Sequence, residues 1–111
     1  MNGTKVLIDT NIALYLFRGD QNLGSTLQGI ETYVSFVNEL ELLGFKGITQ
    51  QEVSWIELFL DECSVVDINK GIKDITIDIR RQYSLKLPDA IVAATAIFLG
   101  IPLISADRQF D

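Results

Sequence analysis

Short, continuous apolar runs alternate along this chain with longer segments of helical periodicity, and that alternation limits the possible folds more than any other feature. The predicted strands are Val6–Ile8, Tyr33–Val37, Ser64–Ile68 and Pro102–Ser105. A strand that is apolar on both sides is typical of a parallel sheet covered by helices on both faces. We therefore predict an α/β fold, a three-layer α/β/α sandwich around a central parallel sheet of four or five strands. A fifth strand would be natural near the C-terminus, but the sequence to Asp111 shows none, and we expect this edge strand to be missing.

Capping residues, glycines and prolines bound the predicted helices. Helices are expected over about residues 11–18, after the polar segment Asp9–Asn11, and over about 21–28. Asn38 is predicted to cap the next helix, with Glu41 completing a capping box. The later helices are predicted over Gln50–Cys63, after Asn69 with an inner face of Ile72, Ile75, Ile79 and Tyr83, and over Ala90–Leu99 with Pro88 in the first turn. Because this last helix is apolar on nearly every side, we expect it to be central and buried.

Composition indicates one domain over residues 1–111. Of the 111 residues 48% are hydrophobic, which is enough for a core, and no apolar run approaches the ~20 residues of a membrane-spanning helix. The start of the chain lacks the basic and apolar stretches of a signal peptide, and Cys63 is the only cysteine. We therefore expect a soluble, cytoplasmic protein.

The charged residues narrow the chemistry. Fifteen acids against nine bases give a net charge of −6, which argues against broad, sequence-blind binding of nucleic acid. It does not exclude a nuclease, because clustered catalytic carboxylates would produce the same excess. The chain has no histidine, which excludes histidine acid–base catalysis and the commonest zinc sites. Catalysis would have to use carboxylates, hydroxyls, lysine or a metal ion.

Four acids are expected to meet at one edge of the sheet. Asp9 follows the first strand, Glu41 lies in the first turn after the second, and Asp107 follows the fourth. The carboxyl ends of parallel strands share an edge, and open α/β sheets bind ligands outside it, where the strand order reverses. Asp89 reaches the same edge if its helix runs antiparallel to the fourth strand, as a right-handed connection requires.

Carboxylates gathered in one crevice repel each other unless a cation neutralises them. Oxygen ligands alone suit Mg²⁺ or Mn²⁺ rather than zinc, and such an ion can bridge phosphate oxygens and activate water for phosphodiester hydrolysis. Each acid also has a purely structural explanation: Asp9 as a helix cap, Glu41 in a capping box, Asp89 at a helix dipole and Asp107 in a turn. Their coincidence at one edge favours the metal site.

The segments that carry these acids resemble, in order, the four acidic motifs of PIN domains. They are Val6–Asn11, Ser35–Leu42, Leu87–Ala94 and Leu103–Phe110. The compact length is similar to the VapC-type branch, the toxins of bacterial toxin–antitoxin pairs. This resemblance implies a Mg²⁺- or Mn²⁺-dependent endoribonuclease that acts on RNA, forms homodimers and is inhibited by a small antitoxin protein.

The same resemblance assigns roles to single residues. The positions that match the metal-binding acids are Asp9, Glu41, Asp89 and Asp107. Glu39 competes with Glu41 for the second place, and the alignment of the motifs favours Glu41. The positions that match supporting polar residues are Thr10, Asn11 and Ser105.

The basic, aromatic and thiol side chains have expected roles of their own. Arg108 is the preferred contact to an RNA phosphate because it follows Asp107, and the remaining candidates are expected to be ordinary solvated charges: Lys46, Arg80, Arg81 and Lys86. Trp55 and Phe59, one turn apart, are expected to pack in the core rather than form an exposed patch for a partner. Cys63 is expected to be a buried small apolar residue.

Other functions fit parts of the sequence. A receiver-like signalling domain would accept a phosphoryl group on an acid such as Asp67, but it needs paired acids after the first strand and a lysine after a late one. Here Thr10 follows Asp9, and no lysine follows Lys86. A phosphatase of the Asp-x-Asp type is excluded by Asn11. A non-catalytic PIN-like binding module is the other alternative, against which the presence of all four acids argues.

Overall fold

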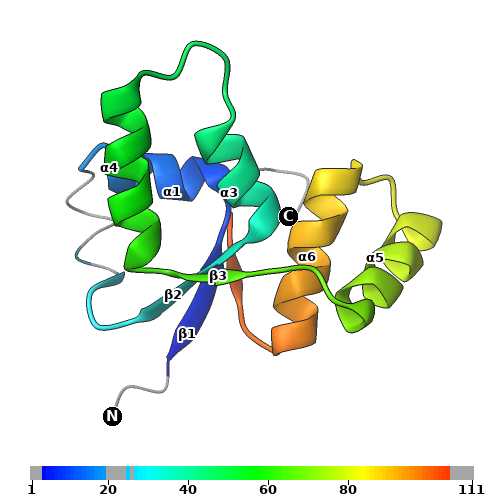
Figure 1. The fold of residues 1–111 in the computed structure, drawn as a ribbon. Helices are drawn as coiled ribbons and strands as arrows, with labels where there is room; N and C mark the ends of the chain where they lie inside the picture. Colours follow the sequence, from blue (N-terminus) through cyan, green and yellow to red (C-terminus); the bar gives the residue numbers. More distant parts are fainter. Residues whose placement is uncertain (1–3, 20–24, 26, 106–111) are drawn as a thin grey trace.

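The strand order reverses beside the first strand of a parallel sheet. The computed structural model describes residues 4–19, 25 and 27–105, and its strands are β1 (Lys5–Ile8), β2 (Glu31–Ser35), β3 (Ser64–Val66) and β4 (Leu103–Ile104). β1 pairs in parallel with β2 and β4, and β3 pairs with β2, which gives the order β3-β2-β1-β4 (Figure 1). The chain builds outward to β3 and then crosses back to β4, so the junction of β1 and β4 is the topological switch point.

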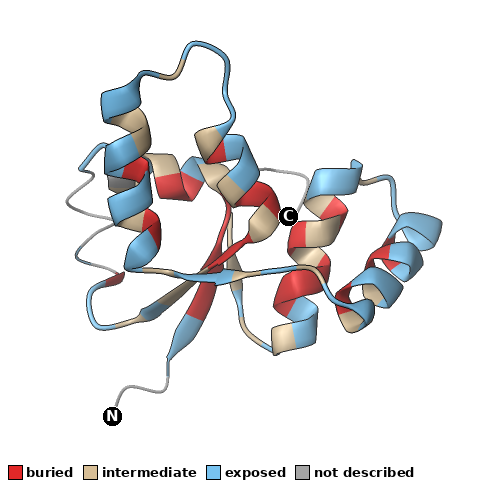
Figure 2. Cartoon of the chain, viewed as in Figure 1, coloured by how far each residue is buried: buried red, intermediate tan, exposed pale blue. Residues whose placement is uncertain are grey.

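Helices cover both faces of this sheet, and the predicted three-layer sandwich is confirmed. Ile8 packs with α1 and α4 on one face, and Leu7 packs with α6 on the other, with α5 outside α6 (Figure 1). Buried residues follow β1 and the sides of α1 and α6 that face it (Figure 2). The helices are α1 (Thr10–Phe17), α3 (Phe36–Leu43), α4 (Gln50–Asp61), α5 (Lys70–Gln82) and α6 (Leu87–Leu99). None of these described helices is long and apolar enough to cross a membrane.

Several predicted bounds need correction. β2 ends at Ser35 rather than Val37, because the Ser35 hydroxyl accepts a hydrogen bond from the Val37 N–H at 3.1 Å and caps α3. Asn38 and Glu41 therefore lie inside α3, and the predicted capping box between them is wrong. The predicted helix over about 21–28 falls largely outside the described residues, and so does any strand after residue 105.

Side-chain burial corrects two predicted helix faces. On α5, Ile72 and Ile79 are buried as predicted, but Tyr83 lies just past the helix and is 63% exposed. α6 is central, as predicted, and packs between the sheet and α5, but it is not buried throughout, because Ile97 and Phe98 are 59% and 46% exposed. Apolar composition alone does not tell which sides of a helix its neighbours cover.

The aromatic pair on α4 divides between core and surface. Phe59 packs against the buried core, as predicted, whereas Trp55 is 48% exposed and the core prediction is wrong for it. Cys63 is half-buried, and its thiol donates to the Phe59 carbonyl at 3.5 Å. Loss of water around Cys63, reinforced by the nearby Glu62 charge, raises the pKa of the thiol to about 11, so it is not an activated nucleophile.

A capping box does occur, at the start of α4. The Thr49 hydroxyl accepts from the Glu52 N–H at 3.1 Å, and the Glu52 carboxylate accepts from the Thr49 N–H at 2.9 Å. The hydrogen bond from the Thr49 N–H to the carboxylate, followed by a smaller effect of the Thr49 side chain, lowers the pKa of Glu52 from its ordinary value of 4.5. We expect Thr49→Ala to lower the free energy of unfolding by about 1 kcal/mol at pH 7.

This destabilisation should depend on pH. A carboxyl group whose pKa is lowered by folding stabilises the native state above its unfolded pKa, and that contribution is lost as the pH falls through the folded value. Thr49→Ala keeps the backbone N–H and removes only the smaller, side-chain contribution to the lowered pKa of Glu52, so the gap in unfolding free energy between wild type and Thr49→Ala should narrow slightly as the pH falls below 4.5. Urea denaturation at neutral and acidic pH measures it, with the exposed Ser54→Ala on the same helix as a control. An equal gap at both pH values would contradict a contribution of the Thr49 side chain to the lowered pKa of Glu52.

Candidate functional site

A polar pocket of about 270 Å³ lies at the carboxyl end of β1. Its walls come from the first turns of α1 and α6 and from one side of α3, and the residues that line it are Asp9, Thr10, Asn11, Asn38, Glu41, Asp89 and Val92. None of these lining residues is a lysine, an arginine or a cysteine. The fold thus brings three of the four predicted acids to one pocket, while Asp107 and Arg108 lie outside the described residues.

Asp9 is buried, and groups from α1 and from the end of β4 donate hydrogen bonds to its carboxylate. As the N-cap of α1, its Oδ1 accepts from the Ile12 N–H at 2.8 Å. Its Oδ2 accepts a hydrogen bond from the Ser105 hydroxyl at 2.5 Å, and Ser105 directly follows β4. Asp9 therefore does cap α1, as its structural explanation predicts. The cap involves only Oδ1, and the carboxylate still lines the pocket. Ser105, predicted as a supporting hydroxyl, joins the two strands that border the switch point.

Glu41 is positioned by two neighbouring polar side chains. The Thr10 hydroxyl donates to Glu41 Oε1 at 2.6 Å. The Asn38 amide donates from Nδ2 to the Thr10 hydroxyl oxygen at 2.7 Å and to Glu41 Oε1 at 3.3 Å. Reversing the amide would turn the Asn38 oxygen toward the Glu41 carboxylate, so repulsion fixes its orientation. The network ties the start of α1 to α3 and holds the carboxylate at the pocket.

Asn38 is a site residue that the sequence analysis missed. It is 3% exposed, and its Oδ1 is buried without a hydrogen-bond partner in the described part of the chain. Residues three apart share one face of a helix, so the spacing of Asn38 and Glu41 could have revealed the pair. The capping interpretation concealed it, because it placed the start of the helix too late.

The structure separates the two glutamates that compete for the second acidic position. Glu41 lines the polar pocket, whereas Glu39 lines a different cleft between α3 and α4, together with Glu57 and Asp61. Residues two apart on a helix point to different sides, so only one of the two can lie beside Asp9. The geometry favours Glu41.

Asp89 reaches the pocket from the other face of the sheet. It lies in the first turn of α6, which begins at Leu87 with Pro88 beside it. The partial positive charge of a helix N-terminus favours a carboxylate there. As expected for a right-handed connection, α6 has its N-terminus near the strand ends that carry Asp9.

The donor groups fit a hard divalent cation. They are carboxylate, amide and hydroxyl oxygens, the ligand types that Mg²⁺ and Mn²⁺ prefer. Among residues 4–19, 25 and 27–105, no three Asp, Glu or Cys side chains converge tightly enough to enclose an ion by themselves. That spacing is compatible with Mg²⁺, which usually keeps several water ligands and binds through one or two carboxylates.

The topology rules out the receiver-like alternative. Asp67 follows β3, which is an edge strand, and its carboxylate accepts from the Ile68 N–H at 2.8 Å, away from the polar pocket. Doubly wound receiver domains have the strand order 2-1-3-4-5, with the third strand inside the sheet. The order β3-β2-β1-β4 differs, so the receiver-like interpretation is wrong.

The fold and the pocket define an open, parallel α/β protein with an acidic candidate active site at its topological switch point. A sequence profile described as the PIN domain matches residues 6–111. The chain belongs to the PIN domain family. A search of curated proteins finds no match.

Solved structures with the same fold come from toxin–antitoxin complexes. A chain of a toxin–antitoxin complex from Klebsiella pneumoniae is 28% identical, with a TM-score of 0.81 over 95% of this chain and 89% of that one. VapBC2 from Rickettsia felis, bound to a DNA fragment from its promoter, gives 17% identity and a TM-score of 0.81, with coverages of 96% and 91%. DNA-bound VapBC from Salmonella typhimurium gives 18% identity and a TM-score of 0.82, over 96% of this chain and 90% of that one. The last two are too distant in sequence to support more than the fold.

Proposed function

We propose that this chain is a Mg²⁺- or Mn²⁺-dependent endoribonuclease, the VapC-type toxin of a toxin–antitoxin pair, which acts in the cytoplasm, forms a homodimer and is inhibited by an antitoxin protein. Membership of the PIN domain family supports a nuclease. The match to the Klebsiella complex supports an antitoxin partner. The observation that carries the proposal is the convergence of Asp9, Glu41 and Asp89 on one polar pocket.

Each site residue has a proposed role in this reaction. The residues that would hold the metal, directly or through water, are Asp9, Glu41, Asp89 and Asp107. The supporting residues are Thr10, Asn11 and Ser105, joined by Asn38 because of its hydrogen bonds to Thr10 and Glu41. Arg108 would contact a phosphate of the RNA. A non-catalytic PIN-like module is the competing interpretation, and a cleavage assay separates the two.

The chain's own groups prepare the pocket for in-line hydrolysis. A bound divalent ion would supply charge neutralisation at the phosphate and lower the pKa of water. Hydrogen bonds hold Asp9 at both carboxylate oxygens and Glu41 at one. Because the two carboxylates are already oriented, little free energy is needed to reorganise them during the reaction. A carboxylate of the pocket accepts the proton of the attacking water, whose oxygen bonds to phosphorus as the bond to the ribose oxygen breaks, and the leaving ribose oxygen takes a proton from solvent water.

Incubation of the purified chain with single-stranded RNA tests the proposal. Cleavage should require added Mg²⁺ or Mn²⁺ and should stop when EDTA is added. Both ions should also raise the melting temperature, since a ligand that binds the folded state stabilises it by mass action. Intact RNA together with an ion-dependent rise in melting temperature would support the non-catalytic module. EDTA-resistant cleavage would overturn the metal mechanism.

A matched pair of variants on α3 tests the second acidic position. Glu41→Gln should lower the rate of cleavage by about 10- to 100-fold or more, because loss of metal ligands and of their supporting groups has effects of at least this size. Glu39→Gln removes the same charge two residues away but faces a different cleft, so its rate should stay near that of wild type. The reverse ranking would assign the site to Glu39.

A further inference from the structure

A second cavity adjoins the acidic pocket and is called the side cavity below. It has a volume of about 330 Å³, within the range of small-molecule sites. The residues that line it come from α1, from α3 and the loop after it, and from α4; they are Thr10, Leu14, Arg18, Glu41, Leu42, Phe45, Glu52 and Ile56. Thr10 and Glu41, joined by their 2.6 Å hydrogen bond, also line the acidic pocket. The two cavities therefore share a wall, and a ligand bound in the acidic pocket can extend into the side cavity.

The inner part of the side cavity is apolar and carries one aromatic ring. Leu42 and Ile56 are almost fully buried, whereas Phe45, in the loop between α3 and α4, is 41% exposed. A partly exposed aromatic ring beside a cavity is a platform on which a nucleobase can stack. Because every base has such a face, stacking on Phe45 would not by itself distinguish one base from another.

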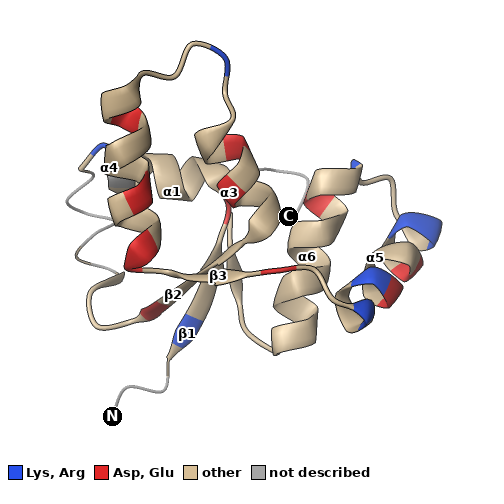
Figure 3. Ribbon diagram, viewed as in Figure 1, with Lys and Arg blue, Asp and Glu red and all other residues tan. Residues whose placement is uncertain are grey.

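Two opposite charges line the side cavity without pairing with each other. In the described part of the chain the ion pair that forms is Lys70 with Asp74 on α5, so Arg18 and Glu52 remain available to a ligand. Among the described residues that line the two cavities, Arg18 alone is basic. Figure 3 shows the basic residues of α5 on the opposite side of the molecule from α4. An RNA bound beside so many acids needs a cation for its phosphates, and Arg18 is placed to supply it.

Glu52 offers a carboxylate whose orientation is fixed. Its Oε1 accepts from the Thr49 N–H, which leaves Oε2 for a ligand. The same N–H lowers the pKa of Glu52, so at neutral pH the group accepts hydrogen bonds and donates none. Guanine is the RNA base whose Watson–Crick edge presents two adjacent donors, N1–H and the N2 amino group. Adenine, cytosine and uracil each place an acceptor beside their donor, and that acceptor would face the carboxylate.

We propose that the side cavity binds a guanine of the RNA substrate next to the phosphodiester that is cleaved. Phe45 stacks on the base, Glu52 accepts from its N1–H and N2 amino group, and Arg18 donates to a neighbouring phosphate. A guanine nucleotide is favoured over a side chain of a protein partner, because it supplies a flat apolar face, two donors and an anion together. The inference rests on the proposed nuclease function and adds a base preference to it.

Titration of the full isotope-labelled chain with mononucleotides, followed by NMR, tests the side cavity without metal or cleavage. Guanosine monophosphate should shift the backbone amide resonances of Arg18, Phe45 and Glu52. It should bind about 10-fold more tightly than the adenosine, cytidine and uridine monophosphates, which is the discrimination expected of a bidentate contact. Inosine monophosphate, which lacks only the 2-amino group, should bind more weakly than guanosine monophosphate.

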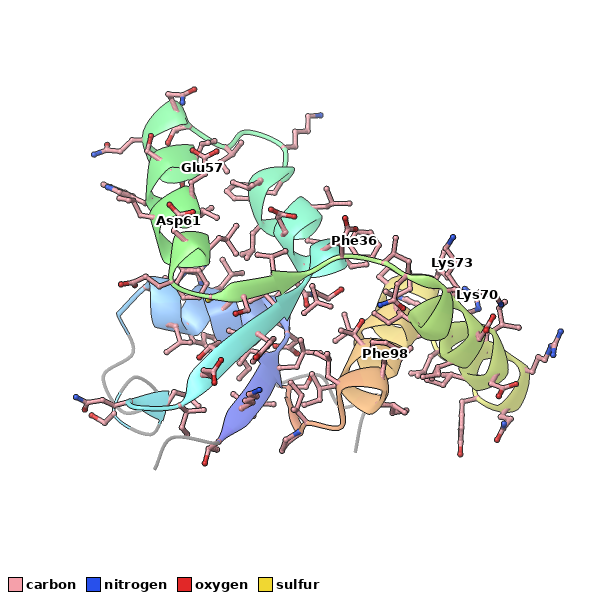
Figure 4. The ribbon with its side chains drawn as sticks, turned by 60° about the horizontal axis from the view of Figure 1, so that its bottom comes forward. Phe36, Glu57, Asp61, Lys70, Lys73 and Phe98 are labelled. Carbon is pink, nitrogen blue, oxygen red and sulfur yellow. The ribbon has the colours of Figure 1, made fainter. Side chains whose placement is uncertain are left out.

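A matched pair of variants on α4 tests the source of the preference. Glu52→Gln should remove it and keep the fold, because glutamine also completes a capping box with Thr49 while its amide group donates toward the base. Glu57→Gln removes the same charge from a residue that lines a separate cleft with Asp61, and it should keep the preference. Figure 4 shows Glu57 and Asp61 on α4.

Stacking is tested by two changes at Phe45. Phe45→Leu keeps an apolar side chain but loses the ring, and it should weaken all four nucleotides by about 10-fold, without changing their order. Phe45→Tyr keeps the ring and should bind as wild type does. Equal binding by the leucine variant would contradict a stacked base.

Mapping the ends of cleaved RNA gives the functional result. Single-stranded RNA of random sequence should be cut with guanine at one fixed position beside the cut, and Glu52→Gln should level that preference. A guanine preference in binding together with uncut RNA would support the base site and contradict the proposed nuclease. The proposal is overturned if the four nucleotides bind equally, if Glu57→Gln loses the preference, or if no nucleotide shifts the three resonances. The last outcome would leave the side cavity to a protein partner.

Discussion

Replacing Asp9 with asparagine should lower the rate of RNA cleavage at least about 100-fold while leaving the protein folded. The carboxylate would lose the charge that attracts a divalent ion. Asparagine caps helices as well as aspartate does, so its side-chain oxygen can still accept from the Ile12 N–H at the start of α1. The Ser105 hydroxyl can accept from the new amide in place of donating to Asp9.

Single-turnover cleavage with saturating Mn²⁺ measures this effect. Asp89→Asn should behave in the same way, whereas Asp78→Asn, which removes an exposed carboxylate on α5, should cleave at the wild-type rate. The melting temperatures of all three should stay close to that of wild type without metal. Undiminished cleavage by both Asp9→Asn and Asp89→Asn would remove the acidic pocket from the mechanism.

Shortening Leu7 to alanine should lower the free energy of unfolding by about 2–5 kcal/mol. Leu7 is 0% exposed in the central strand β1, and its side chain packs with Val92 and Ala96 of α6. The alanine would leave a cavity between the sheet and that helix, which β1 cannot close because it pairs with β2 and β4 on its two sides. Denaturant unfolding gives the magnitude directly.

Leu40→Ala is the matched control for this effect. Leu40 is 63% exposed on α3, so the same truncation should change stability by no more than about 0.5 kcal/mol. A difference of less than 1 kcal/mol between the two variants would mean that Leu7 does not lie in the tightly packed layer described above.

The fold could be predicted because local patterns and global topology agree in this chain. Val6–Ile8 is too short for a helix and too apolar for a strand with one face in water, and it forms most of the inner strand β1. The helix caps at Asp9 and Asn69 were also readable, since short polar side chains there satisfy free backbone N–H groups. The start of α3 could not be predicted, because Ser35 and Asn38 are both good capping residues and only packing decides between them.

Some features of the candidate site could likewise be predicted from the sequence, and others could not. Asp9, Glu41 and Asp89 were identified from their places relative to predicted strands and helices, and the structure brings these three to one pocket. The spacing of Asn38 and Glu41 could have indicated that pair, but the contact of Asn38 with Thr10 could not be predicted, because it joins residues that are far apart in the chain. The exposure of Trp55 could not be predicted either, since burial depends on which helices and strands pack against a side chain.

By itself, the order of residues determined the parallel sheet, its covering helices and the chain positions at which acids could gather, because backbone hydrogen bonding and hydrophobic periodicity are properties of short segments. Only the tertiary structure decided that Glu41 rather than Glu39 lies at the pocket with Asp9, and that Asn38 and Ser105 orient the two carboxylates. Those outcomes depend on the rotation of each helix about its axis and on the crossing of the chain from β3 back to β4. Packing over long sequence separations sets both.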